Sequence, residues 1–157
     1  MKRNGFTLVE LLAVITILAI IATITVPIVI NVFEDAESNA FEDDAMNLSR
    51  AADNYYTALT LESDTKLPLL VTFNNGKETN KYLNNANNQC ETSNDRILEY
   101  SGQNPDGGNI FIDKNGDIYL AIYDGESRKC AIKNPGDSTI TFTDKSKAEC
   151  KLDNNPC

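Results

Sequence analysis

The chain has 157 residues, enough for one small domain and an additional segment. Lys and Arg number 14 against 23 Asp and Glu, so the formal net charge is −9, which disfavours long-range attraction to nucleic acid or to an anionic membrane. Histidine is absent, which excludes a histidine-based catalytic triad and a histidine metal site.

The amino terminus carries a membrane-length apolar segment. Lys2-Arg3-Asn4 and Gly5 precede an apolar run that continues to about Phe33. As a helix, residues 8–33 would extend roughly 39 Å, against a hydrocarbon core of about 30 Å. A secretory signal peptide is the alternative, but its apolar region is shorter, and no A-x-A site follows this run.

The charges that flank this segment predict its orientation. Basic residues precede it, acidic residues follow it immediately, and the next basic residue is Arg50. The acidic residues are Glu34, Asp35 and Glu37. Because basic flanks stay in the cytoplasm, we expect the bulk of the chain to lie outside the cytoplasmic membrane.

Glu10 is an ionisable side chain at the head of the apolar run. A charge at the centre of a membrane helix costs roughly 3 kcal/mol, and less near its end, so such a residue is a functional hypothesis that requires a partner. The alternative is that Glu10 lies among lipid headgroups and has no role.

Gly5 followed by Phe6-Thr7-Leu8-Val9-Glu10 and about twenty apolar residues resembles the processing and assembly motif of type IV prepilins and pseudopilins. The resemblance covers roughly the first third of the chain. It implies cleavage by prepilin peptidase between Gly5 and Phe6, with N-methylation of Phe6. It also implies that Glu10 faces the Phe6 amine of a neighbouring subunit, where an opposite charge would offset the cost of burial.

The resemblance implies a structural subunit that waits in the cytoplasmic membrane, with its carboxyl-terminal part outside, and then enters a cell-surface filament. The implied partners are other pilin subunits, prepilin peptidase, an assembly platform and an ATPase, with no nucleic acid bound by this subunit alone. A minor pseudopilin of a type II secretion or competence apparatus is an alternative. A signal-anchored extracellular binding domain is an alternative of another class.

Residues 6 to about 61 read as one helix that stops near Ser63 or Asp64, before Pro68. Pro27 should bend or locally melt it. The second half, residues 34–62, is amphipathic, with apolar residues recurring at steps of four and three. Those residues are Phe41, Ala45, Leu48, Ala52, Tyr55 and Leu59.

Residues 63–157 should form a β-rich head. Residues 67–73 predict a short strand, and Asn-Gly between residues 109–113 and 117–123 predicts a hairpin. Further strands are expected at residues 128–133 and 139–143, an irregular loop at 80–94, and a short helix from Asn94 or Asp95 to Tyr100. The predicted fold is α+β, with the leader at 1–5, the membrane or filament-core helix at 6–33, and the helix stripe packed on a small antiparallel meander.

Four cysteines, Cys90, Cys130, Cys150 and Cys157, suit an extracytoplasmic domain with two disulfides. Three connectivities are possible. Cys130–Cys150 together with Cys90–Cys157 is favoured, because it would tie down a polar carboxyl-terminal tail.

No catalytic motif is present, so we expect no enzymatic activity and no cofactor. Asp113, Asn115 and Asp117 resemble the start of a calcium loop, with Asp124 at its twelfth position. An EF-hand requires glycine at the sixth position, where Ile118 stands, so a hairpin turn is the better interpretation and no metal site is predicted.

Overall fold

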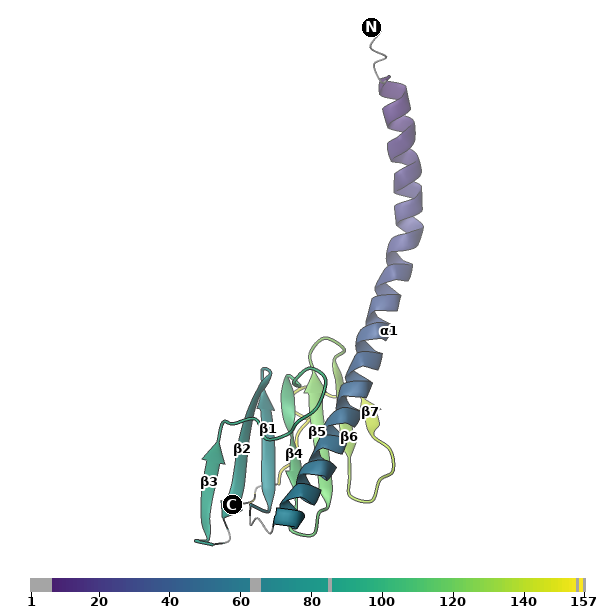
Figure 1. Ribbon diagram of the computed structural model, residues 1–157. Helices are drawn as coiled ribbons and strands as arrows, with labels where there is room; N and C mark the ends of the chain where they lie inside the picture. Colours follow the sequence, from purple (N-terminus) through teal and green to yellow (C-terminus); the bar gives the residue numbers. More distant parts are fainter. Residues whose placement is uncertain (1–6, 63–65, 85, 155, 157) are drawn as a thin grey trace. The chain divides into compact units, whose positions relative to one another are not determined.

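The computed structural model describes residues 7–62, 66–84, 86–154 and 156. Contacts divide the chain into two compact units, Met1–Glu37 and Ser38–Cys157. A single helix, α1 (Leu8–Glu62), runs through the first unit and into the second, and a seven-stranded sheet follows it (Figure 1). The predicted α+β class is confirmed. The predicted end of the helix, at Ser63 or Asp64, lies outside the described residues.

The sheet is antiparallel throughout, in the order β3-β2-β1-β4-β5-β6-β7. The strands are β1 (Leu69–Asn74), β2 (Lys77–Asn84), β3 (Gln89–Ser93), β4 (Gly107–Ile112), β5 (Ile118–Asp124), β6 (Lys129–Lys133) and β7 (Thr141–Thr143). The sheet therefore consists of two meanders, β1 to β3 and β4 to β7, which are joined by the pairing of β1 with β4. The antiparallel sheet is therefore larger than the single small meander that the sequence predicts, because β1 to β3 add a second meander to it.

Two of the turns have the chemistry that their sequences predict. Asn75 and Gly76 join β1 to β2 with φ values of 49° and 72°, as a two-residue hairpin turn requires. Gly116, at φ 91°, lies in the turn between β4 and β5, where an added Cβ would stand 2.4 Å from the Tyr56 ring. The Tyr56 hydroxyl donates a hydrogen bond of 3.1 Å to the Asn115 carbonyl, which ties α1 to this turn.

The core of the second unit lies between α1 and one face of the sheet (Figure 1). Phe41, Ala45, Leu48, Ala52 and Leu59 of the predicted helix stripe are buried, and Tyr55 packs against them. The sheet contributes alternate residues, among them Leu69, Val71, Ile110, Ile112, Leu120 and Ile122, all 0% exposed. The helical period and the strand period thus present their apolar residues to the same core.

Strand β6 also makes polar contacts with α1. The Lys133 ammonium donates a hydrogen bond of 2.8 Å to the hydroxyl of Ser49, which is buried, and Lys129 bonds to Ser38. Lys129 and Lys133 lie on the same side of β6 because strand residues alternate between faces.

Residues 80–94 are not the predicted irregular loop. Most of them form the end of β2 and all of β3. Asn80 of β2 pairs with Ser93 of β3, and the antiparallel pairing continues to Asn84 with Gln89. Backbone pairing does not require apolar side chains, and polar bonds support it here. The Tyr82 hydroxyl donates to Glu91 at 2.8 Å, and the Asn84 amide donates to the same carboxylate at 2.7 Å.

Residues 94–100 are not the predicted helix but part of the crossover from β3 to β4. Side chains satisfy backbone groups that a helix would use: the Arg96 guanidinium donates to the carbonyls of Leu98 and Tyr100, and Glu78 accepts a hydrogen bond from the Ile97 amide. Leu98, which is fully buried, anchors the crossover in the core.

Candidate functional site

In the first turn of α1, Thr7 and Glu10 form hydrogen bonds to each other in both directions. The Thr7 amide and hydroxyl both donate to Glu10 Oε2, at 2.8 and 2.7 Å, and the Glu10 amide donates to Thr7 Oγ1 at 3.2 Å. The Thr7 carbonyl accepts the first helical hydrogen bond, from Leu11, at 3.2 Å. Thr7 is therefore the N-cap, and the pair forms a capping box.

This geometry gives Glu10 a local role that the sequence analysis missed. The signal was present, because Ser or Thr followed three residues later by Glu marks a helix start. The carboxylate also lies where the helix dipole favours negative charge. Among the described residues, no cation forms an ion pair with it, and its predicted partner Phe6 lies outside them, as does Gly5. The intersubunit pairing stays a prediction.

The first half of α1 exposes apolar side chains all round. From Leu8 to Phe33 its large apolar residues are 46–81% exposed. Such a surface is unfavourable in water and requires an apolar environment, either lipid or other helices. By length and composition the helix could cross a membrane, although a signal sequence near the amino terminus satisfies the same criteria.

Three threonine side chains within this segment are hydrogen-bonded inside the helix. The hydroxyls of Thr16, Thr23 and Thr25 donate to carbonyls one turn back, at 2.8 to 3.1 Å. They therefore present little unpaired polarity to lipid or to neighbouring helices. The helix continues through Pro27, so the proline neither ends nor melts it, while the predicted bend stays a prediction.

The cysteines stabilise the carboxyl-terminal tail. Cys130 of β6 is bonded to Cys150, as favoured from the sequence. Cys90 is also disulfide-bonded, and its predicted partner Cys157 lies outside the described residues. The Asn109 side chain adds a clamp: its amide donates to the Leu152 carbonyl at 2.9 Å, and its carbonyl accepts from the Leu152 amide at 2.6 Å.

The Asp113 carboxylate is engaged by its own turn. It accepts hydrogen bonds from the amides of Asn115 and Asp117, at 2.7 and 2.8 Å, and from the Asn115 side chain at 3.1 Å. This is the hairpin interpretation of the calcium-like sequence. Among the described residues, no group of three or more acidic or cysteine side chains is placed to hold a metal ion.

Comparison with known proteins gives one match. Residues 1–26 match the prokaryotic N-terminal methylation motif. No curated protein and no solved structure matches the chain. The matched segment contains Gly5 and Phe6, the predicted positions of cleavage and methylation, together with the Thr7–Glu10 cap, and it is the signature of type IV pilins and pseudopilins. It supports a processed subunit of the pilin or pseudopilin type.

Proposed function

We propose that this chain is a structural subunit of a type IV pilus or a related filament, polymerised through α1. The observation that carries the proposal is the methylation motif at residues 1–26, continuous with an exposed apolar helix that has a carboxylate at its first turn. An apolar helix of this kind is stable in lipid before assembly and among its copies afterwards, where other helices replace lipid.

Processing follows from the same segment. Prepilin peptidase would cut between Gly5 and Phe6, and N-methylation would modify the new terminus. In the filament the Glu10 carboxylate would face the Phe6 amine of a neighbouring copy. That pairing offsets the cost of burying either charge and sets the stagger between adjacent helices.

Location and partners follow from the same proposal. The subunit waits in the cytoplasmic membrane with its sheet outside, then passes into a surface filament through a platform protein and an assembly ATPase. The proposal assigns it no catalytic activity, and the chain contains no histidine to serve as a general base. A minor pseudopilin of a secretion or competence apparatus is the second form of the proposal.

The experiment is to shear cells that produce the chain and to detect it in the released fibres and in the membranes, with and without prepilin peptidase. The proposal predicts fibres that contain the chain, lost when the peptidase is deleted. If the chain is found only in membranes and its processing still depends on the peptidase, the pseudopilin form of the proposal is indicated. If the chain is distributed identically between fibres and membranes with and without the peptidase, the proposal is contradicted and an anchored binding domain is favoured.

A further inference from the structure

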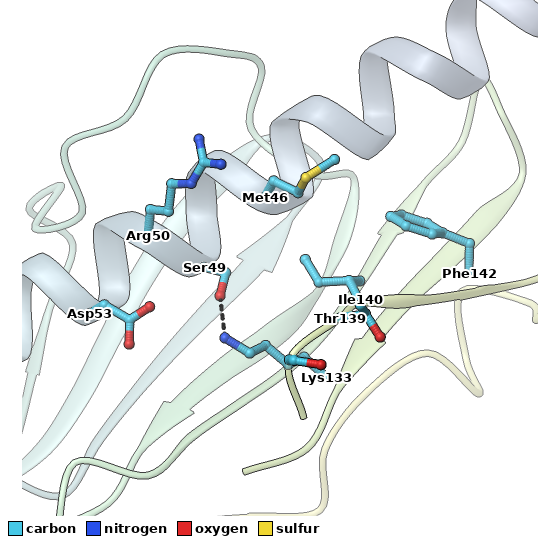
Figure 2. A pocket seen from close by; sticks show the side chains of 9 residues that line it. Met46, Ser49, Arg50, Asp53, Lys133, Thr139, Ile140 and Phe142 are labelled. Carbon is cyan, nitrogen blue, oxygen red and sulfur yellow. Dashed lines mark hydrogen bonds between the residues drawn. The ribbon is translucent and has the colours of Figure 1, made fainter. Parts of the chain in front are cut away.

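A surface cavity of about 420 Å³ lies where α1 meets β6 and the segment that leads into β7 (Figure 2). Met46, Ser49, Arg50 and Asp53 line it from α1, and Lys133, Thr139, Ile140 and Phe142 line it from the sheet side. All of these residues belong to the second unit.

One part of the cavity wall is apolar. Met46 is 39% exposed although it lies one residue from the buried Ala45. Ile140 and Phe142 are half-buried, and Phe142 is fixed by an edge-on contact with Phe41, with ring centroids 6.0 Å apart. The apolar wall is therefore held in place and accessible, as a docking pocket requires.

The other part of the wall is cationic. Arg50 is exposed and forms no hydrogen bond or ion pair with the residues that the structure describes. The Lys133 ammonium is held 2.8 Å from Ser49 Oγ, which leaves two of its three donor positions for another partner. Asp53 is the one carboxylate among the lining residues, so the cavity carries a net positive charge within a chain of net charge −9.

A segment of the same chain has the complementary pattern. Phe33 is 63% exposed, and the exposed Glu37 lies four residues further along α1, so the two side chains share one helix face. Glu34 and Asp35 add negative charge beside them. Because helical residues contact each other only over three or four positions, Glu37 does not reach Arg50 of its own helix.

We propose that the cavity receives the Phe33–Glu37 segment of a second copy of this chain, with Phe33 against Ile140 and Phe142 and with Glu37 facing Arg50 and Lys133. The proposal rests on the filament function, which brings copies of α1 side by side. It gives that function a specific contact: copies with an excess of acidic groups repel at long range, and this local pairing of opposite charges selects one stagger between them.

The test is a charge swap in the full-length chain, measured as sheared fibre yield relative to the membrane-inserted pool. Arg50→Glu places two acidic groups opposite each other, and Glu37→Arg places cations opposite each other. We expect each to lower the yield by about ten-fold, since like charges in a contact repel each other. The double variant restores the attraction and should recover to within roughly three-fold of wild type.

Matched controls are Lys114→Glu and Glu126→Arg, which make the same charge changes at exposed positions outside the cavity. They should leave the yield unchanged. Fibres unaffected by either single reversal, or a double variant no better than the singles, would overturn the contact and leave the filament function standing. Wild-type cells that yield no fibres would overturn the contact and would leave only the pseudopilin form of the proposed function.

Discussion

At the first turn of α1, the Glu10 carboxylate caps its own helix and also carries a negative charge. Glutamine serves as well as glutamate in a capping box, so Glu10→Gln retains the cap and removes the charge, while Glu10→Ala removes both. We expect both variants to be processed and inserted but poorly incorporated into fibres, because in the proposed filament the charge pairs with the neighbouring amine. Immunoblots of sheared and membrane fractions measure this outcome.

Glu126→Gln is the control for that experiment, because it removes one negative charge from an exposed position of the second unit. Normal incorporation of Glu10→Gln together with failure of Glu10→Ala would assign the effect to helix capping and refute the pairing.

The ionisation of Tyr100 should make the stability of the second unit depend on pH in the alkaline range. Burial raises the pKa of Tyr100 to about 12; the carboxylates of Glu78 and Asp44 act in the same direction, and Arg96 opposes them. The unfolded tyrosine ionises near its ordinary pKa of 10, whereas the folded residue keeps its proton and bonds to Asn104. Stability is therefore fully present below pH 10 and is lost as the pH rises from 10 towards 12.

Tyr100→Phe should flatten that loss. Thermal unfolding in detergent between pH 9 and pH 12 compares the slopes for wild type and variant, and the other tyrosines contribute equally to both. Equal slopes would show that Tyr100 does not carry the effect.

Among the elements, the packed interface between α1 and the sheet should contribute most to the free energy of unfolding. Leu48 is fully buried in it, whereas Leu61 of the same helix is 82% exposed. Leu48→Ala should lower the free energy of unfolding by about 2–5 kcal/mol, because it leaves a cavity. Leu61→Ala is the matched control and should change it by less than about 0.5 kcal/mol. Denaturant unfolding of the detergent-solubilised chain measures both, and similar effects would contradict this assignment of the core.

The Cys130–Cys150 bond should stabilise the sheet by restricting the unfolded chain. It spans 20 residues of sequence, and a loop of that length corresponds to roughly 3 kcal/mol in the chain-entropy description. Cys130→Ser with Cys150→Ser should lower the unfolding free energy by about that amount. Proteolysis near Leu152 should rise only modestly, because the Asn109 clamp remains. An unchanged denaturation midpoint would show that the bond is dispensable.

Local patterns predict some elements of this chain and not others. Helix α1 is predictable because apolar residues recur on one face in consecutive turns from Phe41 to Leu59. Strands β2 and β3 are not, because their pairing relies on backbone groups and on polar contacts such as Tyr82 with Glu91, which leave no period in the sequence. The crossover at 94–100 has an apparent helix signal, but Arg96 binds the nearby carbonyls of Leu98 and Tyr100, and the Ile97 amide donates to Glu78 of β2.

The candidate sites divide in the same way. The Thr7–Glu10 cap is local and readable from four residues. The cavity depends on Lys133 reaching Ser49, 84 positions earlier, and such a contact follows only from the register of the folded sheet.

For the whole molecule, the apolar half of α1 and the acidic remainder place opposite demands on the environment. The large apolar residues from Leu8 to Phe33 are exposed, while the chain as a whole carries a net charge of −9. A filament reconciles these demands, because apolar helices share a dry core and charged sheets remain in water. In the proposed filament pathway, Lys2 and Arg3 would remain on the cytoplasmic side and would be removed with the leader.

The most direct measurement is the intact mass and amino-terminal analysis of the chain recovered from sheared cell surfaces. We predict a mature chain that starts at N-methyl-Phe6, without residues 1–5. A chain that still begins at Met1, or one cut beyond residue 20, would contradict it and indicate an anchored or secreted domain.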